Sequence, residues 1–200
     1  MLEPLLQDAQ WNDEPISRHS FHQERFSGLN AAQVDFQQVQ FQACRFVDCD
    51  FSRAGFYQST LADCDFSNCN FSTSYWKGCH IVRCKGSGAD FTHARLKETS
   101  LEQVLLCYAN FTGSRWERCA LSGGSLEEAC LASSVLKKLV LDGVSFAGAD
   151  FFHTPLAGLD FSRCILERIT VSDTLQELKG MRIDASQAPG LIRLLGVQVD

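Results

Sequence analysis

One large apolar side chain recurs at every fifth residue along most of this chain. Of the 15 phenylalanines, 14 share one remainder on division by five, and the register they define runs from Ile16 to Val171 without an insertion. Of its 32 positions, 30 hold Phe, Leu, Ile, Val or Trp, and the exceptions are Ala31 and Gly86. A period of five fits neither an α-helix nor an ordinary strand. The chain must therefore turn a corner every five residues and direct one large side chain inward each time.

A second position in the register is mostly small. Two residues before each central position the chain mostly places Ala, Ser or Cys, and eight of the ten cysteines stand there. Cys107 and Cys130 are the other two. Because the sequence contains no CxxC pair, we expect these thiols to be small buried side chains rather than zinc ligands.

The full repeat reads small, Asp or Asn, Phe or Leu, Ser or Thr, then a variable residue. Near-perfect copies are CDFSR (49–53), CDFSN (64–68), CNFST (69–73), ADFTH (89–93), ANFTG (109–113) and LDFSR (159–163). This pattern resembles the pentapeptide-repeat family over about residues 16–175. The resemblance implies an all-β solenoid, a right-handed quadrilateral β-helix in which four repeats make one coil of 20 residues.

The spacing of the cysteines supports the same coil length. Cys44, Cys64 and Cys84 recur at intervals of 20 residues, so they are expected to stack on successive coils. The 32 repeats then predict about eight coils. We expect an N-terminal cap over residues 1–15, the β-helix over 16–175, and a C-terminal cap and dimerisation segment over 176–200.

The C-terminal segment predicts a short helix over about residues 187–195. Asp184 precedes it as a capping residue and Gly196 ends it. The apolar residues of this segment plug the open end of the core, or they also pair two subunits around a two-fold axis. The residues concerned are Leu191, Ile192, Leu194 and Leu195, followed by Val197 and Val199, which alternate like a final strand.

Two stretches resemble one group within the family. The ending LLGVQV (194–199) looks like the LGIxV ending of Qnr-type proteins, and IVRCKGSGADF (81–91) is similar to a mid-chain Qnr segment. The group includes Qnr, MfpA, McbG and AlbG, and the resemblance implies a dimeric rod that binds DNA gyrase or topoisomerase IV as a mimic of duplex DNA. Qnr proteins carry loops between repeats, whereas this register is unbroken. The chain is therefore more similar to a loop-poor relative such as AlbG, which implies protection from albicidin.

Two surfaces are candidates for the partner site. The residues before the central position on one face form a row of carboxylates and amides that is able to imitate phosphates, namely Asp50, Asn70, Asp90, Asn110 and Asp150. The alternative is that these side chains hydrogen-bond to the backbone of their own turns. The second candidate is a bulge around Gly86, with Lys85, Arg95 and Lys97 pointing outward, and its alternative is a poor repeat without a function.

Charge and motifs exclude several other classes of protein. The net charge is −6, spread evenly over both halves of the chain, which argues against a nucleic-acid binder with a basic patch. The five histidines follow no metal-ligand spacing, so we expect no enzyme, metal or cofactor. The N-terminus lacks a signal-peptide pattern and no apolar run is long enough for a membrane span, which predicts a cytoplasmic protein. The alternative function is a scaffold solenoid without a topoisomerase partner.

Overall fold

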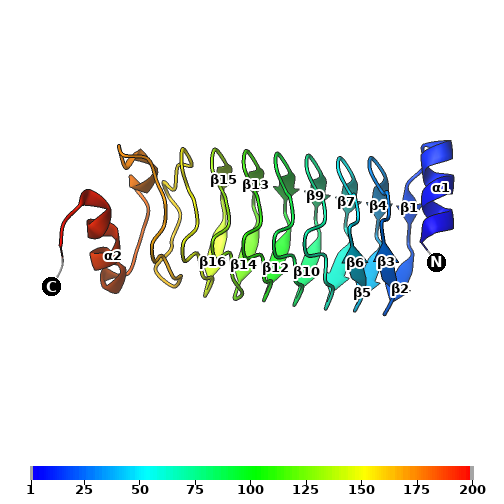
Figure 1. Ribbon diagram of the computed structural model, residues 1–200, viewed down its shortest axis with the longest axis horizontal. Coiled ribbons are helices and arrows are strands. Elements are labelled where there is room, and N and C mark those ends of the chain that lie inside the picture. Colours follow the sequence, from blue (N-terminus) through cyan, green and yellow to red (C-terminus); the bar gives the residue numbers. More distant parts are fainter. Residues whose placement is uncertain (1, 199–200) are drawn as a thin grey trace.

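Short parallel strands stack at intervals of 20 residues along the chain and form the β-solenoid that the register predicts. The computed structural model describes residues 2–198. Figure 1 shows the coils stacked along the long axis of a rod, with helix α1 at one end and helix α2 at the other. In each pair of neighbouring strands the central residues face each other, as Phe36 faces Phe56.

Two faces of the rod are seven-stranded parallel sheets. The first, here called sheet A, contains β1 (Ile16–Ser17), β4 (Asp35–Gln37), β7 (Gly55–Tyr57), β9 (Tyr75–Lys77), β11 (Arg95–Lys97), β13 (Arg115–Glu117) and β15 (Val135–Lys137). Sheet B contains β2 (Ser20–His22), β5 (Gln40–Gln42), β8 (Thr60–Ala62), β10 (His80–Val82), β12 (Ser100–Glu102), β14 (Ala120–Ser122) and β16 (Val140–Asp142).

The other two faces are held mainly by isolated bridges. Strands β3 (Arg25–Ser27) and β6 (Arg45–Val47) begin the third face, and bridges continue it from Arg45 to Ile165. On the fourth face bridges run from Asn30 to Thr170. Six complete turns of 20 residues separate β1 from β15, and the bridges extend the stacking beyond them, close to the length that the repeat number predicts.

Both inward positions of the repeat are buried, as expected. Central side chains stack in columns along the rod: Phe51, Phe71, Phe91 and Phe111 have neighbouring ring centroids 4.9 to 5.1 Å apart. The eight cysteines in the small position are buried and free. Burial raises the pKa of the Cys79 thiol to about 11, so this thiol stays protonated near neutral pH. Their expected role as small apolar side chains is consistent with this placement.

Each corner is made by the residue two positions after the central one. This residue adopts a left-handed backbone conformation in nearly every repeat, as at Gln38 (φ 56°) and Arg53 (φ 59°). Glycine occupies the corner in other repeats, for example Gly88 (φ 68°). A left-handed conformation costs a non-glycine residue free energy. The backbone hydrogen bonds between coils, such as Arg53 N–H to the Ser72 carbonyl at 2.9 Å, compensate for that cost.

Helix α1 (Glu3–Asn12) covers the N-terminal end of the core. Leu2, Leu6 and Ala9 are buried against the first coil, and Leu5 is partly buried there. Asp13 ends the helix in a left-handed conformation (φ 54°). The segment thus shields the first coil, whose edge would otherwise leave apolar side chains and backbone groups unpaired.

The last coil is longer than the others. Asp160 bridges Arg182, a separation of 22 residues, because a short 3-10 helix (Gln176–Leu178) intervenes. Glu177 in this helix is buried and accepts hydrogen bonds from the His153 N–H and the Ser172 hydroxyl, both at 2.8 Å. This carboxylate thus ties the inserted residues to the preceding coil.

Asp184 caps the C-terminal helical segment, as predicted. Asp184 accepts a hydrogen bond from the Ser186 N–H at 2.9 Å, and Gln187 completes a capping box. Three short helical segments follow one another here: a 3-10 helix (Ala185–Gln187), α2 (Ala188–Ile192) and a second 3-10 helix (Arg193–Leu195). Gly196 ends them in a left-handed conformation (φ 76°). No helix within residues 2–198 is long and apolar enough to cross a membrane.

Candidate functional site

The predicted row of carboxylates and amides lies in one ladder on the fourth face. Parallel bridges join its members in sequence, from Asn30 through Asp50, Asn70, Asp90, Asn110 and Cys130 to Asp150. Each step of the ladder is one strand spacing, about 4.8 Å. The face is therefore a straight row of polar side chains along the rod.

These side chains also hold their own turns, as the alternative interpretation expected. The Asp50 carboxylate accepts the Ser52 N–H at 2.9 Å, and the Asp90 carboxylate accepts the Thr92 N–H at the same distance. Asn70 additionally donates from its side-chain amide to Asp50 at 2.9 Å, which links two coils. Their side chains are half-buried, so one oxygen serves the turn while the carboxylate still projects negative potential. The two interpretations of this row are compatible.

The expected bulge around Gly86 is absent, so that prediction was wrong. Lys85 bridges Asp65 on one side and Leu105 on the other at the regular spacing of 20 residues, and the Gly86 N–H donates to the Leu105 carbonyl at 2.8 Å. A Cβ atom on Gly86 would lie 2.7 Å from Cδ2 of Phe66 and 2.9 Å from Cδ2 of Leu106. Glycine therefore stands here because its neighbours in the column fill the space.

The structure does not bring the second group of predicted residues together. Lys85 and Gly86 lie on the third face, whereas Arg95 and Lys97 lie in β11 of sheet A. Two repeats separate Gly86 from the centre of β11, so the two pairs point to opposite sides of the coil. Their binding of a partner stays a prediction, and they are not one site.

Sequence reasoning missed a concentration of positive charge on sheet A. The outward positions of β9, β11, β13, β15 and the corners after them carry seven cations and two carboxylates, although the whole chain has a net charge of −6. Reading the outward residues at intervals of 20 residues would have found it, since Lys77, Lys97 and Lys137 share one column. The average charge of each half of the chain conceals this face.

The predicted dimer residues divide into two sets. Leu191 and Leu194 pack against the core, whereas Ile192, Leu195 and Val197 are exposed by 39%, 64% and 49%. The cap thus closes the core with one side and presents apolar side chains with the other. Val199 lies outside the described residues, and Val197 lies in no strand.

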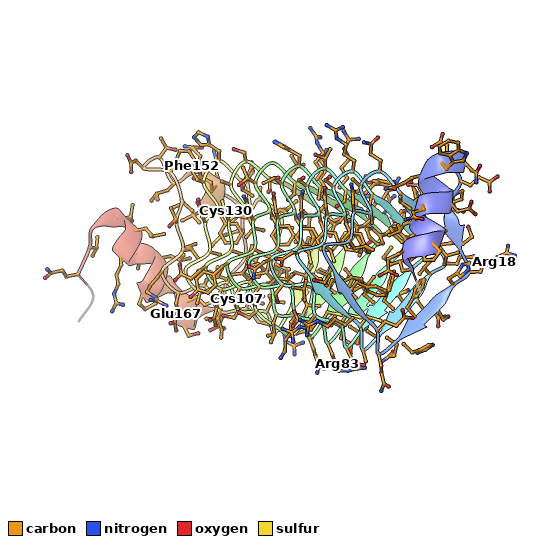
Figure 2. The ribbon with its side chains drawn as sticks, turned by 45° about the vertical axis from the view of Figure 1, so that its right-hand side comes forward. Arg18, Arg83, Cys107, Cys130, Phe152 and Glu167 are labelled. Carbon is orange, nitrogen blue, oxygen red and sulfur yellow. The ribbon has the colours of Figure 1, made fainter. Side chains whose placement is uncertain are left out.

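The described part of the chain contains no group of three His, Cys, Asp or Glu side chains arranged to hold a metal ion. Side chains fill the interior of the rod. Figure 2 shows Arg83 and Phe152 projecting from the outer surface of the rod. Cys107 and Cys130, the two cysteines outside the small position, are half-buried. That the protein is not an enzyme and needs no cofactor stays a prediction.

Several solved structures are similar to this chain, and one of them has a TM-score above 0.5. A trypsin-treated variant of QnrB1, a plasmid-mediated fluoroquinolone resistance protein, has a TM-score of 0.58 at 22% identity and covers 93% of this chain and 99% of its own. Full-length QnrB1 gives 0.49 at 20% identity, covering 89% of this chain and 100% of its own. A third structure is that of HetL, a pentapeptide repeat protein of the cyanobacterium Nostoc that is involved in heterocyst differentiation regulation. Its TM-score is 0.40 at 11% identity, and the match covers 89% of this chain and 92% of HetL. No curated protein matches the chain.

Two family models match the sequence. One, described as a pentapeptide repeat region, matches residues 54–131. The other, described as pentapeptide repeats (8 copies), matches residues 35–72 and 129–168. The matched segments join into one stretch, residues 35–168, that coincides with the stacked coils. The chain is a pentapeptide-repeat protein.

Proposed function

We propose that this protein binds a type II DNA topoisomerase, DNA gyrase before topoisomerase IV, as a mimic of duplex DNA, and protects it from the poison albicidin. The observation that carries the proposal is the row of Asp50, Asp90 and Asp150 carboxylates on one flat face of a rigid rod. Such a row presents negative charge at fixed intervals to the basic groove with which a topoisomerase holds DNA.

Two further features support the proposal. The fold is shared with QnrB1, which is a fluoroquinolone resistance protein. The register of this chain runs without a loop from Ile16 to Val171, and this favours a loop-poor, AlbG-like protein over a quinolone-protecting one. Albicidin is therefore the poison that we expect the protein to counter.

A dimer belongs to this proposal. The exposed side chains Ile192, Leu195 and Val197 lie at the C-terminal end of the rod, where a second copy related by a two-fold axis would cover them. Two rods joined end to end would double the length of the acidic row. A cytoplasmic location, where gyrase is found, stays part of the same prediction.

The test is DNA supercoiling by purified gyrase, titrated with this protein, with and without albicidin and a quinolone. We expect rescue of supercoiling under albicidin and little rescue under the quinolone. The informative variant combines Asp50→Asn, Asp90→Asn and Asp150→Asn. Asparagine keeps the oxygen that accepts the turn N–H, so the coil stays folded while three charges are removed.

The matched control combines Asp48→Asn, Glu128→Gln and Glu167→Gln, which removes the same charge from exposed positions of the third face. We expect the first variant to lose most of its protection and the control to keep it. If neither drugged nor undrugged gyrase responds to the wild-type protein, the topoisomerase proposal is wrong and a scaffold solenoid is the better description.

A further inference from the structure

The outer surface of sheet A carries a concentration of cations that form no ion pair with another described residue. Strands β9 to β15 and their corners place six of them there, and we call this set the basic band: Lys77, Arg95, Lys97, Arg115, Lys137 and Lys138. Five of the six side chains are exposed and that of Lys97 is half-buried. The band runs over four neighbouring strands, a length of about 14 Å.

Cations of the basic band lie directly beside each other. Arg95 pairs in register with Arg115, and Lys77 pairs in register with Lys97. Like charges opposite each other on neighbouring strands destabilise a sheet. The fold by itself therefore gives no reason for this arrangement.

Two other charged columns of the molecule place opposite charges on neighbouring coils. Arg83 holds Asp63 one coil away with two hydrogen bonds of 2.7 and 2.8 Å. Arg182 lies 3.4 Å from Asp160 on the neighbouring coil. In these columns a cation follows a carboxylate, whereas in the band Lys97 follows Lys77 and Arg115 follows Arg95. Glu117 interrupts the lysine column between Lys97 and Lys137, and Arg118 binds its carboxylate. The contrast indicates that the band is arranged for an external anion.

The carboxylates near the basic band leave it largely uncompensated. Glu98 and Glu117 are the two acidic side chains on this part of sheet A, and Arg118 binds both, at 2.6 and 2.8 Å. Within residues 2–198 no carboxylate oxygen lies within 4.0 Å of a cationic nitrogen of the band. Each of its six charges thus remains available to a ligand.

The chemistry of the basic band indicates which anion fits. Four of its six cations are lysines, a residue that is depleted at protein–protein interfaces and common among phosphate contacts. Arg95 and Arg115 add planar groups that bind phosphate oxygens in pairs. The regular spacing of the strands suits a polymer with repeating charges better than a compact anion.

Aromatic side chains continue the band toward the N-terminus. Tyr57 and Tyr75 lie on β7 and β9 of the same sheet, with ring centroids 5.7 Å apart. A surface hollow beside them is lined by Gln37, Tyr57, Gln58, Lys77, Gly78 and Glu98. Tyrosines beside a row of cations are typical of surfaces that hold nucleic-acid chains, where the cations bind phosphates and the rings stack on bases.

We propose that the basic band binds the phosphate backbone of a nucleic acid. This goes beyond the proposed function, since the acidic row lies on the next face of the coil and neither surface requires the other. It also replaces the expectation, drawn from the evenly spread charge of the sequence, that the protein has no direct contact with nucleic acid. The band exists only after the coils stack.

The experiment titrates the full-length protein, without a topoisomerase, against a fluorescein-labelled duplex of about 20 base pairs and a single strand of the same length. Fluorescence anisotropy gives Kd over a series of salt concentrations. The test variant is Arg95→Gln with Arg115→Gln. The control is Arg53→Gln with Arg168→Gln, which removes the same charge from exposed corners of other faces. Glutamine already occupies such corners at Gln38 and Gln58, so the control keeps the coil.

Loss of two phosphate contacts should weaken binding between about 10- and 100-fold at low salt. It should also reduce the slope of log K against log salt by about 1.8 for the duplex or about 1.4 for the single strand. The strand that the wild type binds more tightly identifies the form of nucleic acid. The control should retain the wild-type affinity and slope, and circular dichroism melting checks that both variants are folded.

Three results would overturn the proposal. The first is no binding of either oligonucleotide at low salt. The second is an equal loss of affinity in the test variant and in the control. The third is competition by poly-glutamate as strong as that by the oligonucleotide at equal charge, because the band would then be a site for an acidic protein. The gyrase assay is separate, so failure of one proposal leaves the other intact.

Discussion

At the scale of the residue, burial depends on the place in the repeat rather than on the residue type. Phe151 is fully buried, whereas Phe152, the next residue and the one phenylalanine outside the register, is 42% exposed. A phenylalanine in the core column packs against other buried rings, whereas the ring of Phe152 lies partly in solvent and stacks on His153. The register therefore distinguishes the buried residues that stabilise the rod from the exposed residues that are available to bind a partner.

Replacing Phe71 by Ala should lower the free energy of unfolding by about 3–5 kcal/mol. Its ring stacks between those of Phe51 and Phe91, with centroid distances of 5.1 and 4.9 Å, and its loss leaves a cavity in the column. Phe152→Ala is the matched control and should cost less than about 1 kcal/mol. Chemical denaturation measures both. Equal costs for the two variants would contradict the assignment of the core column.

Gly86 allows a second test at this scale. Gly86→Ala places a Cβ against the Phe66 ring and should destabilise the protein by about 1–3 kcal/mol. If the clash with that ring is the cause, the cost falls when Phe66→Leu is added, since leucine lacks the ring. A double-mutant cycle measures this coupling. Strictly additive effects would show that Gly86 is required for another reason.

At the scale of the element, the short strands are stable only as members of a stack. Most of them have three residues, and each pairs with a strand about 20 residues away rather than with the next strand along the chain. The two caps stabilise the rod in another way, because they cover the ends of the stack of coils. Glu177 holds the C-terminal end together, because its carboxylate joins the inserted 3-10 helix to the coil at His153.

The hydrogen bonds to the Glu177 carboxylate predict that the stability of the folded protein depends on pH. Burial opposes ionisation of this carboxyl group, but hydrogen bonds from its own backbone, Ser172 and His153 outweigh burial and lower its pKa. A carboxyl group with a lowered pKa in the folded state stabilises that state above its usual pKa of about 4.3, and the stabilisation is lost as the pH falls through the lowered value.

Glu177→Gln should therefore reduce Tm at pH 7, and the difference from the wild type should shrink below a pH of about 4. Thermal melting over a pH series measures both values. The control Glu167→Gln changes an exposed carboxylate and should leave Tm nearly unchanged. A difference between Glu177→Gln and the wild type that is the same at all pH values would show that the charge is not what stabilises the cap.

At the scale of the whole molecule, two faces of the rod differ in the charge that they present. The acidic row and the basic band lie on adjacent faces of the same coils, and the C-terminal end presents apolar side chains. A rigid stack fixes the distances within each surface. The rod is therefore suited to hold repeating charges at set intervals.

The exposed apolar side chains at the C-terminal end predict a dimer, and two substitutions there should dissociate it. Ile192→Asp with Leu195→Asp places charges on exposed side chains of the cap and should give a folded monomer in analytical ultracentrifugation. Both residues point away from the core, unlike Leu194, so the fold should persist. Leu105→Asp with Val140→Asp charges exposed apolar positions on the sides of the rod and should remain dimeric. A dimer in the first variant would place the interface elsewhere.

The sequence by itself determined the repeat unit, because a period of five with one large and one small inward position permits few other folds. It also determined the C-terminal cap, since Asp184 and Gly196 act on their own neighbours through local hydrogen bonds and backbone conformation. Local chemistry of this kind does not depend on the rest of the chain.

Only the tertiary structure decided what lies on each face. Lys77 and Lys97 are 20 residues apart, and hydrogen bonds between coils bring them side by side. The same stacking decided that Gly86 fills a gap instead of making a bulge, because Phe66 and Leu106 come from neighbouring coils. The average composition does not reveal such contacts, because electrostatic and steric energies depend on the distances between atoms and not on the separation of residues along the chain.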